Sequence, residues 1–133
     1  MTLSELRGDI VILACAVSAG IHAALVPAHF REGTGPGVGF VVATVLLAAL
    51  AVVLTRSPSQ LALAGATTVF VGLIFGYAFA STTGIPVFHP DVEPVDGLAV
   101  FTKAVELIGL FTASSLIGRP LRATFPSPKG TLT

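Results

Sequence analysis

The stretch Gly37 to Leu54, GVGFVVATVLLAALAVVL, decides the fold of this chain. It runs for 18 residues without a charged side chain. About 20 apolar residues in an α-helix cross the roughly 30 Å of hydrocarbon in a bilayer. Inside lipid, every backbone polar group has to be satisfied within its own segment, which a helix does. The stretch is therefore predicted to be a transmembrane helix.

Three other apolar runs of similar length flank this one, and the last of them is interrupted by Lys103 and Glu106. The connections between successive runs are short, so neighbouring helices are expected to be antiparallel. The sequence predicts an all-α fold, an integral membrane up-down four-helix bundle over residues 10–117. The expected helices are residues 10–28, 37–54, 61–80 and 97–117.

The charged residues outside these runs predict the orientation of the bundle. Residues 1–9 are expected to form an interfacial lead-in, and residues 118–133 a basic tail. Arg31 is the one cation on the side of the first connection, whereas five cations fall on the other side: Arg7, Arg56, Arg119, Arg122 and Lys129. The positive-inside rule then places both termini in the cytoplasm of a multi-pass protein of the inner (plasma) membrane.

Composition supports a membrane protein and excludes other classes. Hydrophobic residues make up 53% of the chain and charged residues 11%, with a mean hydropathy of +0.92, whereas soluble domains carry roughly 25% charged residues. The net charge is zero, so no basic surface is available for nucleic acid. Cys15 is the single cysteine, which excludes an intrachain disulfide. The expected partners are the lipid bilayer and other membrane subunits or further copies of this chain.

The first apolar run carries two histidines, His22 and His29, in the stretch SAGIHAALVPAHFRE. Seven residues are close to two helical turns, so both side chains should lie on nearly the same face if Pro27 only kinks the helix. With a rise of about 1.5 Å per residue, His22 and Lys103 reach similar depths from the same side. Glu106 lies one turn deeper. The first and fourth helices are therefore expected to be neighbours, with Lys103 and Glu106 able to form an intramembrane ion pair.

The imidazoles and carboxylates on this side of the bundle form a candidate site for a divalent metal such as copper or zinc. We expect a deep site of His22 with Glu106 and an outer site of His29 with the loop residues His89 or Glu93. The full candidate ligand set is His22, His29, Glu32, His89, Glu93 and Glu106. Structural roles remain open for the same residues, namely an ion pair, a hydrogen-bonded neutral histidine, an interfacial histidine and a solvated loop histidine.

Two local motifs also carry predictions. The segment His29 to Pro36, HFREGTGP, is expected to form a tight polar loop. In the third run, Gly65, Gly72 and Gly76 recur near helical spacing, the last two framing the sequence GLIFG, which is typical of a small-residue face for helix packing. Neither a phosphate-binding glycine loop with its lysine nor a nucleophile elbow or a zincin motif is present. The motifs therefore give no positive sign of an enzyme.

The pattern GIHAALVPAHFRE, followed by GIPVFHPDVEPVDGL and AVELIGL, resembles uncharacterised small four-helix integral membrane proteins of high-GC Gram-positive, actinobacterial-type bacteria. The resemblance covers Ser18 to Ile117. It implies the four-helix layout and singles out His22, His29, Pro86 and Glu106, but it brings no activity.

Three function classes are compatible with these residues. The favoured one is an accessory subunit of a larger membrane complex, with a His/Glu site that binds a metal. The second is a proton- or ion-linked transporter acting as an oligomer. The third is a membrane anchor for haem b with His22 as an axial ligand, in which the opposite ligand has to come from His29, His89 or another subunit.

Overall fold

The computed structural model describes residues 1–86 and 91–121, and this part of the chain is an all-α four-helix bundle. The helices are α1 (Leu3–Glu32), α2 (Thr34–Arg56), α3 (Gln60–Thr82) and α4 (Gly97–Leu116). All four are long and apolar enough to cross a membrane, which confirms the predicted fold class. His89 and most of the predicted basic tail, residues 122–133, lie outside the described residues.

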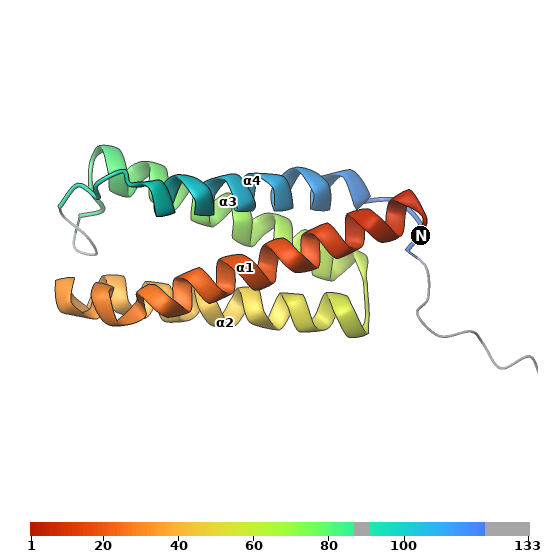
Figure 1. Cartoon of the computed structure of the whole chain (residues 1–133), viewed down its shortest axis with the longest axis horizontal. Helices are drawn as coiled ribbons and strands as arrows, with labels where there is room; N and C mark the ends of the chain where they lie inside the picture. Colours follow the sequence, from red (N-terminus) through yellow and green to blue (C-terminus); the bar gives the residue numbers. More distant parts are fainter. Residues whose placement is uncertain (87–90, 122–133) are drawn as a thin grey trace, which may run out of the picture.

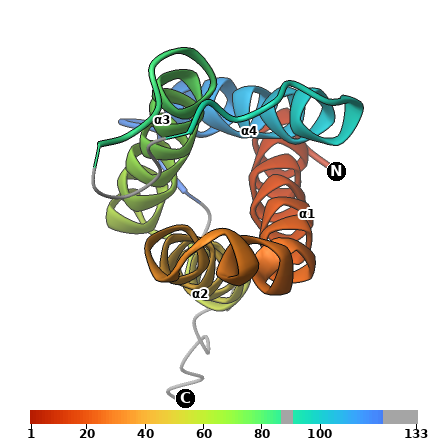
Figure 2. The ribbon, with the colours of Figure 1, turned by 90° about the vertical axis from the view of Figure 1, so that its left-hand side faces the viewer.

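The helices run up and down around a ring, as the end-on view in Figure 2 shows. α1 packs against α2 and α4, and α3 completes the ring between them, so the predicted contact between the first and fourth helices is present. We call the end that carries Gly33 and the α3–α4 connection the loop end. The opposite end carries the N-terminus, the α2–α3 connection and the end of α4, and is called the terminal end (Figure 1).

Helix α1 begins at Leu3, seven residues before the apolar run that predicted it. A capping box explains the early start. The Thr2 side chain accepts a hydrogen bond from the backbone N–H of Glu5, and the Glu5 carboxylate accepts one from the backbone N–H of Thr2. This reciprocal pair satisfies two donors that a helix start otherwise leaves unpaired. Most of the expected lead-in, residues 1–9, is therefore part of α1.

The tight polar loop expected over His29 to Pro36 is a wrong prediction. α1 continues through Pro27 to Glu32, Gly33 is the single residue between the two helices, and α2 begins at Thr34. Pro36 lies in the first turn of α2, where its missing N–H removes no helical hydrogen bond. The Phe30 ring packs against Gly37, where a Cβ atom would collide with it. This close approach seats the last turn of α1 on the first turn of α2.

An apolar layer fills the middle of the bundle and its terminal half. Its centre is the Phe70 ring from α3, which is fully buried against Ala14 of α1 and Gly109 of α4. A Cβ atom at Gly109 would lie 2.6 Å from ring carbons of Phe70 and 2.9 Å from the Ala14 Cβ. Other buried members of the layer are Val11, Cys15, Leu47, Ala66, Ala113 and Leu116. Large side chains such as Phe111 point outward from the bundle, as lipid contact requires.

The glycines of the third run differ in their packing. A Cβ atom at Gly65 would lie 3.2 Å from the Leu50 side chain of α2, so Gly65 takes part in helix packing, whereas the packing expected at Gly72 and Gly76 is absent within the bundle. A Cβ atom added at either position would meet no neighbouring atom within 4 Å. Both glycines instead line a cavity at the loop end. The closest glycine contacts in the described part of the chain are at Gly37 and Gly109, which lie outside the GLIFG motif. Composition alone does not separate a glycine that admits a neighbouring helix from one that leaves a space.

Candidate ligand-binding cavity

Glu106 is the most deeply buried charged residue among those the structure describes, with an exposed fraction of 0%. Its two carboxylate oxygens have separate partners. Oε2 contacts the Lys103 ammonium, one turn earlier on α4, as the three-residue spacing predicts. Oε1 accepts a hydrogen bond of 2.8 Å from the Ser18 hydroxyl on α1. The carboxylate therefore joins α4 to α1 and is satisfied on both sides, which is the condition for keeping a charge inside a membrane bundle.

Lys103 extends from this pair toward α3. Its ammonium lies 3.4 Å from the Leu73 carbonyl oxygen and 5.2 Å from the centre of the Tyr77 ring. A cation over an aromatic face is attracted by the negative charge of the ring. The Lys103 side chain keeps an exposed fraction of 17%, whereas Glu106 keeps none. The lysine is thus the member of the pair that reaches the cavity.

His22 is joined to this network through Ser18. The ring Nδ1 lies 2.8 Å from the Ser18 carbonyl oxygen and 3.4 Å from the Ser18 hydroxyl. A carbonyl only accepts hydrogen bonds, so Nδ1 is the donor and, in a neutral ring, Nε2 carries the free lone pair. The predicted deep contact between His22 and Glu106 is therefore relayed by Ser18, which the sequence analysis did not single out.

His29 lies nearer the loop end and is buried, with an exposed fraction of 5%. Its Nδ1 donates to the Leu25 carbonyl, 3.1 Å away. Its Nε2 lies 3.4 Å from a Glu93 oxygen and 3.8 Å from a Glu32 oxygen. A carbonyl oxygen only accepts hydrogen bonds, so Nδ1 is the donor of the contact with Leu25. The structure brings together two members of the expected outer site, His29 and Glu93, with Glu32 beside them, while His89 lies outside the described residues.

Phe40 of α2 packs against both histidines. Its ring stacks on His29 with centroids 3.6 Å apart, and it meets His22 at 5.0 Å in a tilted arrangement. An apolar ring is thus inserted between two polar layers. Phe40 had no signal in the sequence, because a phenylalanine in an apolar run is the expected residue.

These polar groups surround a cavity of about 460 Å³ that we call the loop-end cavity. All four helices and the α3–α4 connection contribute to its wall. Its mouth carries the carboxylates of Glu32, Glu93 and Asp96, and its deep wall carries Lys103, Tyr77 and His22. Its volume falls within the range of small-molecule sites, about 300 to 1,000 Å³. The remaining lining is largely apolar, including Ile21, Leu25, Leu73, Ala80, Ile85 and Leu98.

No protein-family model, curated protein or solved structure matches this chain. The interpretation of the cavity therefore rests on its own geometry.

The Tyr77 hydroxyl is the one buried side-chain polar atom without a hydrogen-bond partner in the described part of the chain. Tyr77 lines the loop-end cavity beside Lys103. Leaving a buried hydroxyl unpaired costs about 1 to 3 kcal/mol. A group inside the cavity, either water or a ligand, is the partner that the surrounding protein does not supply.

The metal and haem hypotheses stay predictions. Within residues 1–86 and 91–121, no group of three or more His, Cys, Asp or Glu side chains is arranged to hold a metal ion. The two histidines of these ranges, His22 and His29, are both on α1 and both use Nδ1 for a backbone carbonyl of their own helix. An opposite axial haem ligand would have to come from His89 or from another subunit.

Proposed function

We propose that this chain is a small integral membrane binding protein, acting as an accessory subunit, that takes up a small ligand in the loop-end cavity. The observation that carries the proposal is the position of the Lys103–Glu106 pair. Glu106 is fully buried and satisfied, while Lys103 and Tyr77 face a cavity that all four helices line. A deep polar wall in a mostly apolar cavity is the arrangement that fixes the orientation of a ligand.

The closed middle of the bundle favours binding over transport. Between the loop-end cavity and the terminal half lies the apolar layer around Phe70, Ala14 and Gly109. This layer closes the loop-end cavity toward the terminal half. In the proposed orientation, which follows the distribution of cations, the loop end lies on the side of the inner membrane that faces away from the cytoplasm.

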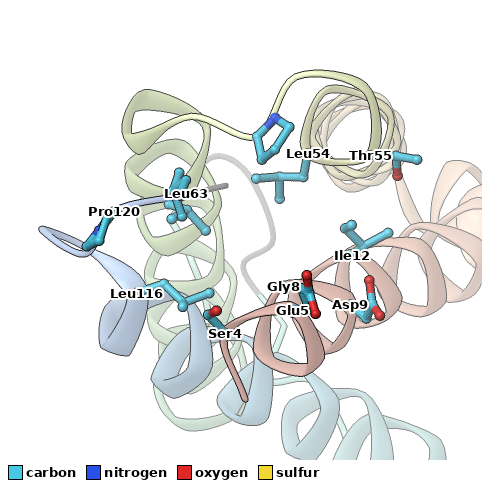
Figure 3. Close-up of a pocket in the computed structure, with 12 residues that line it drawn as sticks. Ser4, Glu5, Gly8, Asp9, Ile12, Leu54, Thr55, Leu63, Leu116 and Pro120 are labelled. Carbon is cyan, nitrogen blue, oxygen red and sulfur yellow. The ribbon is translucent and has the colours of Figure 1, made fainter. Parts of the chain in front are cut away.

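A proton- or ion-linked transporter is the second candidate, and one observation favours it. A further cavity of about 460 Å³ lies at the terminal end, lined by Ser4, Glu5 and Asp9 of α1, by Leu54 and Thr55 of α2, and by Leu63 and Leu116, among others (Figure 3). The bundle therefore has a cavity at each end with the Phe70 layer between them. Transport would require that layer to open, by rearrangement or in an oligomer.

Cysteine accessibility separates the two candidates. In a Cys15→Ala background, single cysteines are introduced at Thr102, which lines the loop-end cavity, and at Ala113, in the apolar layer. Thr82→Cys, exposed at the loop end, marks the orientation. A small membrane-impermeant methanethiosulfonate reagent is applied to intact cells and, separately, to inverted vesicles.

The binding proposal predicts labelling of Thr82→Cys and Thr102→Cys in intact cells only, and no labelling of Ala113→Cys. Labelling of Thr102→Cys from both sides would favour the transporter. An unreactive Thr102→Cys beside a reactive Thr82→Cys would show that the cavity is closed and would refute the binding proposal. Labelling of Thr82→Cys in inverted vesicles alone would reverse the orientation.

A further inference from the structure

The chemistry of the loop-end cavity narrows the class of ligand, and this inference rests on the proposed binding function. We infer that the cavity takes a neutral, largely apolar molecule with a carbonyl oxygen that accepts hydrogen bonds from Tyr77 and Lys103, and that the molecule enters from lipid between α2 and α3. Quinones and ester lipids share this chemistry.

The charges around the cavity disfavour both kinds of ion. Three carboxylates, Glu32, Glu93 and Asp96, line the mouth, and a ligand anion would have to pass them. Deeper in, Glu106 already balances the Lys103 ammonium, so an anion gains no net positive charge there. A ligand cation would meet that same ammonium at the deep wall, in a low-dielectric setting where like charges repel strongly. A neutral ligand avoids both costs.

The deep wall offers donors for an acceptor. The buried Tyr77 hydroxyl has no partner among the described residues, and the Lys103 ammonium, which lies over the Tyr77 ring, has three donor hydrogens. Two of those hydrogens point to Glu106 and the Leu73 carbonyl. A carbonyl oxygen accepts two hydrogen bonds, so one oxygen beside Tyr77 can satisfy the hydroxyl and the remaining lysine hydrogen together.

The glycines of α3 give the cavity its lateral opening. Gly72 is exposed on the outside of the bundle and also lines the cavity, and Gly76 lines it one turn further along. Neither would bring a Cβ atom within 4 Å of a neighbour. Among the neighbouring helix pairs of the described chain, α2 and α3 make the fewest contacts. The apolar part of the ligand can therefore extend through this seam into lipid.

Intrinsic fluorescence provides a direct test, because Tyr77 is the only tyrosine and the chain has no tryptophan. Decylubiquinone is titrated into the protein in detergent micelles and quenching of Tyr77 is recorded. Dioctanoylglycerol, decanoate and decyltrimethylammonium are then used as competitors, so that an ester carbonyl, an anion and a cation are compared. Gly76→Leu adds a side chain at the cavity wall, where an added Cβ atom meets no neighbour within 4 Å. Gly20→Leu is the matched control, because Gly20 has equal free space outside the cavity.

We expect saturable quenching that Gly76→Leu abolishes and Gly20→Leu preserves, and no displacement by either ion. Displacement by dioctanoylglycerol would extend the ligand to ester lipids, and its absence would restrict it to quinones. Tyr77→Phe, measured by equilibrium dialysis, should bind decylubiquinone about fivefold more weakly, as expected for one lost hydrogen bond.

Two results would overturn the inference in different ways. In the first, decanoate or decyltrimethylammonium displaces decylubiquinone, and Gly76→Leu no longer binds that ion. This result would refute a neutral carbonyl compound as the ligand, but the cavity would remain a binding site. Quenching that stays linear, or that is equal in Gly76→Leu and the wild type, would refute binding of carbonyl ligands in the cavity. The proposed function would then be decided by the accessibility of Thr102→Cys.

Discussion

The Lys103–Glu106 pair makes an asymmetric prediction about stability. Lys103→Met leaves the Glu106 carboxylate buried with the Ser18 hydroxyl alone, so we expect a loss near 4 kcal/mol, within the 3 to 5 kcal/mol typical of breaking a buried pair. Glu106→Leu leaves the Lys103 ammonium, which retains the Leu73 carbonyl and a path into the cavity. Its cost should be nearer 2 to 3 kcal/mol, because a lysine can extend its charge toward water.

The double variant Lys103→Met with Glu106→Leu removes both charges and should lie within about 1 kcal/mol of the wild type, since an apolar pair of similar volume often replaces a buried ion pair without loss. Reversible unfolding in mixed micelles by SDS titration, followed by Tyr77 fluorescence, measures all three free energies of unfolding. Simple addition of the two single effects in the double variant, to about 6 or 7 kcal/mol, would show that the charges are not coupled and would refute this account of the pair.

Three further predictions concern single positions and use the same unfolding assay. Gly109→Ala should lower the free energy of unfolding by about 1 to 3 kcal/mol, because the new Cβ atom overlaps the Phe70 ring in a packed layer. An unchanged free energy of unfolding would mean that the layer can repack around the added methyl group. Gly72→Ala should be neutral or stabilising by up to about 1 kcal/mol, from helix propensity in open space, and a clear loss would show that a neighbour is present there. Thr2→Ala should cost about 1 kcal/mol by removing the N-cap, and hydrogen exchange of the first turn of α1 should accelerate; unchanged exchange would argue against the capping box.

The fold was predictable because lipid requires every apolar run to satisfy its backbone hydrogen bonds within its own segment, which a helix does. Four runs of adequate length lead to four helices, and the bundle follows from their short connections. The connection between α1 and α2 was not predictable from polarity. His29 and Glu32 are polar, but Pro27 and Pro36 are both compatible with a helix at their positions, so the helices continue almost to each other. The start of α1 did have a signal, the Thr2-to-Glu5 spacing of a capping box.

The depth of the polar residues in the bundle was predictable, but their contacts were predicted only in part. Helical rise places His22, Lys103 and Glu106 near each other, because depth depends on counting alone. The roles of Ser18 and Phe40 depend on the rotation of each helix about its axis. The sequence of an apolar run does not show which side faces the bundle when every side is hydrophobic. Tyr77 lines the loop-end cavity, but a missing hydrogen-bond partner is visible only when all neighbours are known.

The single-residue connection at Gly33 also has a consequence for how the protein is made. A chain with one residue between two long helices gives neither helix enough slack to settle in the bilayer while the other stays in water. We therefore expect α1 and α2 to enter the membrane together as a helical hairpin, and in the proposed orientation the turn leads. Arg31 and Glu32 sit side by side at that turn and carry opposite charges. In that orientation the turn crosses the hydrocarbon with these two opposite charges next to each other, so the segment that crosses carries little net charge.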